Sequence, residues 1–300
     1  MHWPIAQIGS LTMVDQERPV FRFAPSPNGY LHLGHAYSAL LNAKMAREMG
    51  GRLLLRIEDI DAARCRPAYE RAIYEDLAWL GLHWDEPVRR QSEHLADYAQ
   101  VLNELRARGL IYPCFCSRGD IIRATGTRPD WPRDPDGSPL YPHTCRLMDD
   151  AERAVRLAAG ERAAWRLDLH RAVREIGAPV TWTQFEDAHA THMVFGEPEA
   201  WGDVVLARRD IGATYHISVV VDDAQQGITD IVRGKDLFAS TSVHRLLQAL
   251  LGLAAPRYRH HDLITDMSGH KLSKSRGSPS LRDLRASGVT PEQIGRAVGL

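Results

Sequence analysis

The segment from residue 21 to residue 57 constrains the fold of this 300-residue chain more than any other. Residues 21–24 are apolar and are followed by a Pro- and Gly-containing stretch at 25–29, which predicts a strand that ends in a turn. Apolar residues recur at helical spacing over 34–49, and 53–57 is interpreted as a continuous apolar run, as expected for a strand covered on both faces. A strand, a helix and a strand in this order predict a parallel βαβ unit.

The rest of the chain predicts further helices and strands on either side of an irregular insertion. Helices are expected over 67–80, 92–109 (capped by Ser92) and 237–251, and strands over 203–208, 217–221 and 260–264. Between Cys114 and Cys145 the composition shifts to Pro, Gly, Asp and Arg, which predicts an irregular segment unable to bury a core of its own.

We therefore expect an α/β protein whose core is interrupted by an insertion. The expected parts are an N-terminal extension over 1–18, the first half of the core over 19–110, the insertion over 111–200, the second half of the core over 201–280 and a short helical tail over 281–300. The length of the chain fits a core domain with an insertion, at roughly 150 residues per domain.

Composition and charge exclude several classes of protein. The apolar fraction of 44% and the charged fraction of 25% are typical of soluble globular proteins. Lys and Arg number 37 against 38 Asp and Glu, which argues against a general polyanion binder with a basic surface overall. No long uncharged apolar stretch and no Lys/Arg-rich start are present, so we expect no membrane partner, no export signal and a cytoplasmic location.

The first chemical motif runs from Arg22 through His32, Gly34 and His35, between a strand and the start of a helix. Backbone N–H groups and the helix dipole favour anions at such a point. Glycine permits close approach of a flat ring or a phosphate, and two histidines three residues apart can donate hydrogen bonds to phosphate oxygens. The alternative is an ordinary capped helix start with two solvated histidines.

The second motif is the basic stretch Lys271-Leu-Ser-Lys-Ser275 near the end of the chain. Two lysines and two serines in a loop can surround a triphosphate, with Lys271 and Lys274 as point charges for the charge that develops during nucleotidyl transfer. A solvated basic loop is the alternative, and it is the commoner fate of such a run.

Three of the four cysteines, Cys114, Cys116 and Cys145, are clustered in the insertion. Structural zinc takes four ligands, usually thiolate or imidazole, so one position is left for a nearby residue. Tyr141 and His143 are the near candidates, and chemistry alone favours the imidazole of His143. The alternative is three reduced thiols without metal.

Together and in this order, the two motifs resemble the signature pair of class I aminoacyl-tRNA synthetases, whose catalytic core is of the Rossmann type. The residues around Ser26 resemble those of glutamyl-tRNA synthetases and their relatives more narrowly. The resemblance extends to 56–61, 221–223 and 232–237 and covers about residues 19–280. Leu272 stands where Met is commonest, an apolar exchange that is expected to matter little.

This resemblance implies ATP-dependent activation of L-glutamate, with Mg²⁺ accompanying ATP. It implies catalytic roles for His32, His35, Lys271 and Lys274, and ATP contacts from His32, Gly34, His35 and Lys274. It places the glutamate on Arg22, Phe23, Ala24, Pro25, Ser26, Glu58, Tyr215 and Arg233, with Glu58 on the ammonium. Glu58 directly follows a predicted strand, where open α/β sheets bind ligands. Asp59 and Asp61 are expected to be structural partners instead.

Only 25 residues follow Ser275, which leaves no room for the helical anticodon-binding region of glutamyl-tRNA synthetases. This pattern resembles the short paralogues of that family, the glutamyl-queuosine tRNA(Asp) synthetases. Their Cys-x-Cys, Tyr and Cys spacing fits Tyr141 and Cys145, so the resemblance implies one structural Zn²⁺ on Cys114, Cys116, Tyr141 and Cys145. It also implies a monomer that transfers glutamate to the queuosine base at the wobble position of tRNA(Asp).

Contacts to tRNA require a basic and partly aromatic surface, because single-stranded loops are bound by stacking and by cations on phosphates. The candidates are Arg123, Arg128, Trp131, Arg133, Arg208 and Arg209. Two other functions stay open: a truncated glutamyl-tRNA synthetase that charges tRNA(Glu), and a non-catalytic paralogue that binds tRNA. The full-length family is expected to need tRNA(Glu) for glutamate activation.

Overall fold

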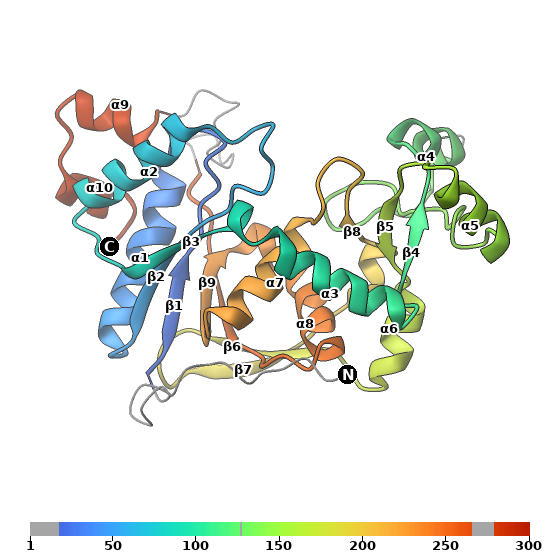
Figure 1. Ribbon diagram of the computed structural model, residues 1–300. Helices are drawn as coiled ribbons and strands as arrows, with labels where there is room; N and C mark the ends of the chain where they lie inside the picture. The colour runs from blue at the N-terminus through green and yellow to red at the C-terminus, as the bar shows by residue number, and fades with distance from the viewer. Residues whose placement is uncertain (1–17, 127, 266–278) are drawn as a thin grey trace.

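The computed structural model describes residues 18–126, 128–265 and 279–300 (Figure 1). Figure 1 shows an elongated molecule in which sheet β1–β2–β3 lies at one side and sheet β4–β5–β8 at the other, with α7, α8 and β9 between them. Helix α3 runs across the front from β3 toward β4. Residues 1–17 of the N-terminal extension, residue 127 and residues 266–278 lie outside the described residues.

Two mostly parallel sheets form the core. In order across each sheet, the first contains β1 (Val20–Phe23), β2 (Arg52–Ile57) and β3 (Asp85–Arg90), and the second contains β7 (Thr191–Phe195), β6 (Thr181–Phe185), β10 (Arg257–His261) and β9 (Asp230–Gly234). All neighbours pair in parallel except the β6–β7 hairpin. Parallel strands are buried on both faces, which explains the largely apolar sequences of β1 and β2.

The two sheets adjoin at their β1 and β9 edges. The starts of the two strands are tied by hydrogen bonds from Thr229 N to Val20 O (3.1 Å) and from Val20 N to the Thr229 hydroxyl (2.8 Å). Further along, the Asn42 amide of α1 donates to the Val232 carbonyl (3.1 Å). The carboxyl ends of both strands therefore lie at one edge, where the sheets part, and ligands bind at such switch points in open α/β sheets.

The helices cover these sheets and connect the strands. They are α1 (Leu33–Glu48), α2 (Pro67–Trp79), α3 (Leu95–Ala107), α4 (Arg118–Thr125), α5 (Asp150–Ala158), α6 (Leu169–Ile176), α7 (Tyr215–Gln225), α8 (Ser240–Leu250), α9 (Leu281–Ala286) and α10 (Pro291–Ala297). Among the described helices, none has the length and apolar character needed to cross a bilayer. Pro67 begins α2, where its missing N–H costs nothing. The tail folds into two short helices, as predicted.

A third, antiparallel sheet joins two strands of the insertion, β4 (Ile111–Cys114) and β5 (Ala164–Leu167), to β8 (Val205–Ala207), which follows the insertion. The expectation that the insertion buries no core is wrong. Aromatic and sulfur side chains form a small buried cluster there, made of Tyr112, Cys114, Phe115, Tyr141 and Cys145.

Three local predictions differ from the structure. Residues 217–221 belong to helix α7 rather than to a strand, because this helix is buried on all sides and its apolar run has no helical periodicity. Ser92 precedes α3 without capping it, because its hydroxyl donates to Asp59 (2.6 Å) and His94 occupies the cap position. The last strand, β10, begins three residues before the expected His260.

Candidate functional site

His32 and His35 organise the start of helix α1. Nδ1 of His32 accepts a hydrogen bond from Gly34 N (3.1 Å), and Nδ1 of His35 accepts one from His32 N (3.1 Å). In the neutral rings the proton therefore lies on Nε2, which makes both rings donors beside the helix N-terminus. A Cβ at Gly34 would lie 3.0 Å from Cε1 of His32, a contact so tight that the His32 ring would have to shift to accept a larger residue.

The chain returns to His32 just after the second motif. Ser280 forms an antiparallel bridge with His32, and Leu281 N donates to Leu31 O (2.8 Å). Lys271 and Lys274 themselves lie outside the described residues. Ser280 and Leu281, which follow the second motif, thus lie beside the start of α1.

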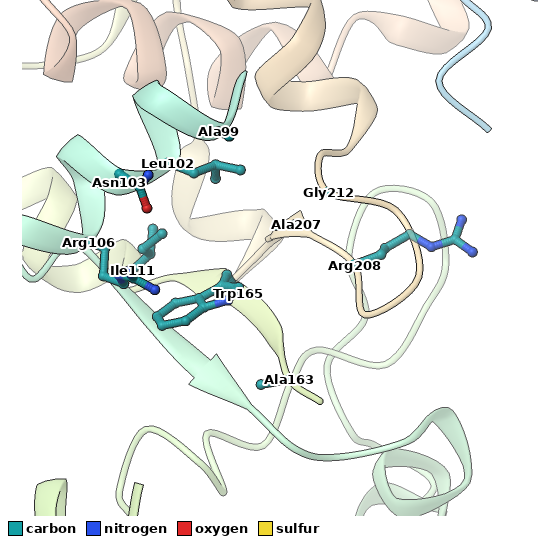
Figure 2. Close-up of a pocket in the computed structure, with 10 residues that line it drawn as sticks. All are labelled: Ala99, Leu102, Asn103, Arg106, Ile111, Ala163, Trp165, Ala207, Arg208 and Gly212. Carbon is teal, nitrogen blue, oxygen red and sulfur yellow. The ribbon is translucent and has the colours of Figure 1, made fainter. Parts of the chain in front are cut away.

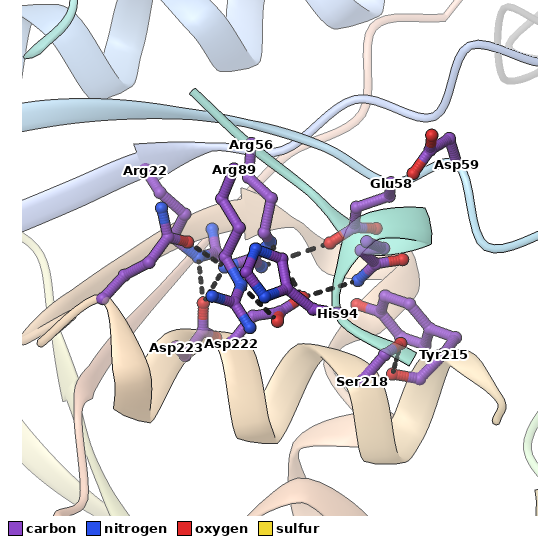
Figure 3. Close-up of polar contacts among 12 residues, drawn as sticks. Arg22, Arg56, Glu58, Asp59, Arg89, His94, Tyr215, Ser218, Asp222 and Asp223 are labelled. Atoms are coloured by element: carbon purple, nitrogen blue, oxygen red, sulfur yellow. Dashed lines mark hydrogen bonds and ion pairs between the residues drawn. The ribbon is translucent and has the colours of Figure 1, made fainter. Parts of the chain in front are cut away.

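A buried charge network lies at the carboxyl ends of β1 and β2 (Figure 3). Arg56 is fully buried and contacts Asp223 (2.8 Å) and Glu58 (3.2 Å), while Arg22 contacts Asp223 (3.1 Å). Burial opposes ionisation of Asp223, but Arg22 and Arg56 hold its pKa below the usual range. Burial raises the pKa of Glu58 in spite of Arg56 and Arg22, so a nearby substrate ammonium would favour its ionised form.

Asp222 supports the same network from helix α7. Its carboxylate is completely buried and accepts hydrogen bonds from Arg89 Nε (2.7 Å), Gln91 Nε2 (2.9 Å) and the Tyr98 hydroxyl (2.8 Å). A buried carboxylate is tolerated when its oxygens are satisfied in this way. The network fixes β2, α3 and α7 relative to one another.

Tyr215 and Arg233 complete the site from α7 and β9. The Tyr215 hydroxyl accepts a hydrogen bond from Arg233 Nη1 (3.3 Å). Burial raises the pKa of Tyr215, while the charges of Arg233 and Arg22 lower it and that of Glu58 raises it. Arg22, Glu58, Tyr215 and Arg233 are thus brought together, and we call them the strand-end site.

The other residues predicted on the glutamate follow β1. The Phe23 side chain packs in the core, so only its main chain is available to a ligand. The Pro25 carbonyl accepts a hydrogen bond from Glu58 N (3.0 Å), which ties the turn containing Ala24 to the end of β2. The Ser26 hydroxyl lies 3.9 Å from the sulfur of Cys65.

Asp59 and Asp61, predicted to be structural partners, make structural contacts. Asp59 accepts hydrogen bonds from Ser92 N and Oγ, and Asp61 pairs with Arg64 (2.8 Å) and Arg208 (3.6 Å).

The three clustered cysteines, Cys114, Cys116 and Cys145, have sulfur atoms within 4.8 Å of one another and could hold a metal ion. The sulfurs of Cys116 and Cys145 are 3.5 Å apart. Zn–S bonds of about 2.3 Å in a tetrahedron require sulfurs about 3.8 Å apart, which fits this arrangement. A hydrogen bond from the Cys114 thiol outweighs burial and lowers the pKa of Cys145 to about 6, whereas the same hydrogen bond, with burial, raises the pKa of Cys114, so Cys145 is the thiolate of this pair before a metal binds. We call these three residues the cysteine cluster.

Tyr141, rather than His143, faces the cysteine cluster. The Tyr141 hydroxyl lies 3.5 Å from the Cys116 sulfur and accepts a hydrogen bond from Cys145 N (2.8 Å). His143 instead points its Nε2 to Asp203 (3.6 Å) and is 40% exposed. The geometry therefore favours a phenolic oxygen as the fourth donor.

The residues predicted to contact tRNA divide into two groups. Arg123, Arg128, Trp131 and Arg133 lie on α4 and the segment after it, where Arg128 stacks on Trp131 at 5.1 Å. Arg208 and Arg209 instead belong to the loop after β8, and Arg208 lines a hollow of about 210 Å³ between α3, β5 and this loop. We call this hollow the Trp165 pocket; Figure 2 shows the Trp165 ring between Arg106 and Arg208, whose guanidinium points away from the ring. Arg106 lies 4.9 Å from the centre of that ring.

Several functional residues were not predicted from the sequence. Arg56 belongs to the motif over 56–61 but received no role, because 53–57 was interpreted as apolar throughout; a lone arginine in such a run indicates a buried ion pair. His244 and His260, which contact Arg233, carry no local signal because they belong to different elements. Trp165 likewise stands alone in the sequence.

Comparison with known proteins shows that the chain is similar to tRNA synthetases for glutamate, both in a family model and in individual relatives. Residues 20–300 match the family model "tRNA synthetases class I (E and Q), catalytic domain". The chain is 47% identical to a Rhodobacter capsulatus protein named "Glutamyl-Q tRNA(Asp) synthetase", over 94% of this chain and 100% of that protein. It is 41% identical to "Glutamate--tRNA ligase 2" of a Methylobacterium species, over 92% of this chain and 58% of that protein.

Among solved structures, the chain resembles a glutamate tRNA ligase from Elizabethkingia meningosepticum in complex with its amino acid. The TM-score is 0.70 at 28% identity, over 91% of this chain and 53% of that ligase. The chain therefore spans about half of the length of that ligase.

Proposed function

The chain belongs to the class I tRNA synthetases for glutamate and glutamine and is therefore a ligase. We propose that it activates L-glutamate with ATP and transfers the glutamyl group to queuosine in tRNA(Asp). Queuosine as the acceptor rests on the names of relatives such as that of Rhodobacter capsulatus. We further propose that the enzyme works as a monomer in the cytoplasm, where ATP and tRNA are present.

The composition of the strand-end site carries the glutamate assignment. Glutamate has two carboxylates and one ammonium, and the site offers two guanidinium groups, Arg22 and Arg233, with the carboxylate of Glu58. Arg22 is paired with Asp223, whereas no carboxylate among the described residues forms an ion pair with Arg233. A buried cation of this kind favours an anionic ligand, since isolated buried charge is costly.

Activation is proposed to proceed by in-line attack of the glutamate α-carboxylate on the α-phosphate of ATP, with pyrophosphate as the leaving group. The Nε2–H groups of His32 and His35 and the start of α1 would donate to phosphate oxygens. Lys271 and Lys274 would neutralise the charge that develops, and bound Mg²⁺ would screen the phosphates. A hydroxyl of the modified base would then attack the mixed anhydride and release AMP.

The Trp165 pocket is the proposed contact for an unstacked base of the tRNA. Its volume of about 210 Å³ is below the roughly 300–1,000 Å³ of pockets that enclose whole drug-sized ligands, so it suits one ring system. Base stacking on Trp165 beside Arg106 would follow the usual pattern of single-strand recognition. The loop after β8 continues from Arg208 to Tyr215, which links the pocket to the strand-end site.

The cysteine cluster is proposed to bind one structural Zn²⁺ with Tyr141 as the fourth ligand. The metal would hold the end of β4 against the irregular segment that carries Tyr141 and Cys145. Its effect would be on the insertion and not on the chemistry of activation.

ATP–pyrophosphate exchange with glutamate and without tRNA tests the proposed activation. We expect exchange by the wild type and its loss in Lys274→Ala. Exchange that appears only after tRNA(Glu) is added would indicate the truncated glutamyl-tRNA synthetase, a function favoured by the 41% identity to "Glutamate--tRNA ligase 2". No exchange under either condition would indicate a non-catalytic protein.

A further inference from the structure

Arg233 is held by a cage of neutral acceptors. Nη1 contacts His244 Nδ1 (3.2 Å) and the Tyr215 hydroxyl, Nη2 contacts the Thr241 hydroxyl (2.8 Å) and the Leu237 carbonyl (3.2 Å), and Nε contacts His260 Nε2 (3.4 Å). The side chain is buried, and all five N–H donors are directed at uncharged groups.

Hydrogen bonds fix the protonation of His260. Its Nδ1 lies 3.0 Å from Oε1 of Gln184, and that oxygen also accepts from the Trp182 indole (3.3 Å). An indole N–H is only a donor, so Oε1 is an acceptor and His260 Nδ1 carries the proton. Nε2 of the same ring is then an acceptor, as its contact with Arg233 requires.

A second chain of hydrogen bonds fixes His244. Its Nδ1 faces Arg233, a pure donor, and must therefore accept. Its Nε2 carries the proton and donates to Nδ1 of His216 (3.2 Å). His244 thus stays neutral, with the lone pair of its Nδ1 directed at Arg233. His216 is neutral as well, and the lone pair of its Nδ1 is directed at the His244 ring.

The surroundings oppose a second proton on any of these rings. Burial, reinforced by the charge of Arg233, holds the pKa of His244 well below its usual range and lowers that of His216 to about 4 and that of His260 to about 2. Arg22 in the same site is different, since its charge is balanced by Asp223 at 3.1 Å. Arg233 is therefore the guanidinium whose charge remains available to a ligand.

We propose that His244 and His260 are positioning residues that keep Arg233 an uncompensated cation, and that this makes the site select a side-chain carboxylate over a carboxamide, glutamate over glutamine. The inference rests on the proposed function and deepens it. The Tyr215 hydroxyl accepts from Arg233 and has its own proton to donate to the substrate. A carboxylate there gains from the nearby charge, whereas a neutral carboxamide does not.

A carboxylate in the cage would remove this preference. It would form an ion pair with Arg233 and cancel most of the field at the ligand. The introduced carboxylate would also be a hydrogen-bond acceptor close to the amide N–H groups of a bound glutamine. The present cage offers a ligand no such acceptor. Selectivity is thus expected to depend on the charge of the cage more than on its shape.

Two matched pairs of variants test the proposal. In His244→Asn and His244→Asp the side-chain oxygen replaces Nδ1, and the two differ in charge but hardly in size. In His260→Gln and His260→Glu the oxygen replaces Nε2 from a different element, β10, which gives a second test if one charged variant fails to fold. Pyrophosphate exchange with glutamate and with glutamine gives KM and kcat for each variant.

We expect His244→Asp and His260→Glu to raise the KM for glutamate roughly 10- to 100-fold, with a smaller change in kcat and in the activity with glutamine. The Asn and Gln variants should show only a modest rise in KM and keep the selectivity. A folded His244→Asp or His260→Glu enzyme with wild-type selectivity would overturn the proposal. Absence of exchange by the wild type would overturn the proposed function as well, so the two failures are distinguishable.

Discussion

The strand-end site and the cysteine cluster are both buried groups of polar side chains, but their charges are satisfied differently. In the strand-end site, Glu58 pairs with Arg56 and Arg22 pairs with Asp223, which also contacts Arg56, at distances of 2.8–3.2 Å. In the cysteine cluster, the sulfurs of Cys114, Cys116 and Cys145 lie within 4.8 Å of one another around a point that a divalent cation fits.

This difference means that the strand-end site and the insertion are stabilised in different ways. Ion pairs within the protein hold the strand-end site together without a metal, so its geometry is set when the core folds. We propose that a metal ion held by the three cysteines would, in contrast, stabilise the insertion. Loss of metal should then leave glutamate activation intact while it disturbs the insertion.

The largest expected effect comes from breaking the ion pairs under the strand-end site. Arg56→Met removes the buried partner of Glu58 and one of the two arginines that pair with Asp223, and it is expected to lower the free energy of unfolding by about 3–5 kcal/mol. Arg52→Met on the same strand is the control, because the Arg52–Asp85 side chains are 37% and 48% exposed, and it should cost about 1 kcal/mol or less. Equal shifts in urea unfolding would contradict the account.

Removal of the uncompensated cation should affect activity more than stability. Arg233→Met is expected to reduce kcat/KM for glutamate in pyrophosphate exchange roughly 100-fold or more. It should destabilise the protein less than Arg56→Met, because no carboxylate among the described residues loses an ion pair. If glutamate activation survived this substitution, the assignment of Arg233 to the substrate would be wrong.

Metal loss should be confined to the insertion. Cys116→Ser is expected to abolish bound zinc, measured by atomic emission, while exchange activity stays within about threefold of wild type. Cys65→Ser, which changes the cysteine outside the cluster, should keep its zinc. The fourth ligand is tested by Tyr141→Phe, which should weaken zinc binding, against His143→Phe, which should not. A wild-type zinc content in Cys116→Ser would disprove the ligand set.

The smallest expected effect concerns the Trp165 pocket. Trp165→Ala should slow transfer to tRNA about tenfold, in line with the stacking of one base, and leave exchange without tRNA unchanged. Trp165→Phe keeps an aromatic face and should retain most of the transfer rate. An equal loss of exchange and transfer in Trp165→Ala would point to a general structural role.

Much of the fold followed from the sequence because the relevant patterns are local. The βαβ unit, α2 with Pro67 at its start and the two short helices of the tail appear where periodicity and turn residues predict them. The α/β fold class, membership of the synthetase family and ligase activity are confirmed by the family match over 20–300 and by the named relatives. The domain boundaries and the individual site roles stay predictions.

The rest of the site depends on the tertiary fold. Helix α7 was predicted in part as a strand at 217–221 because complete burial erases helical periodicity. Arg56 was hidden in a run interpreted as apolar. His216, His244 and His260 come from α7, α8 and β10, and only the folded chain brings them together around Arg233.

The acceptor of the glutamyl group is the most direct test of the central claim. The enzyme would be incubated with ATP, labelled glutamate and bulk tRNA, taken either from queuosine-containing cells or from a queuosine-deficient source. We predict that label enters only the queuosine-containing tRNA. Equal labelling of the two samples would contradict the claim and identify an enzyme that charges tRNA(Glu), and the absence of label from both would contradict transfer to tRNA altogether.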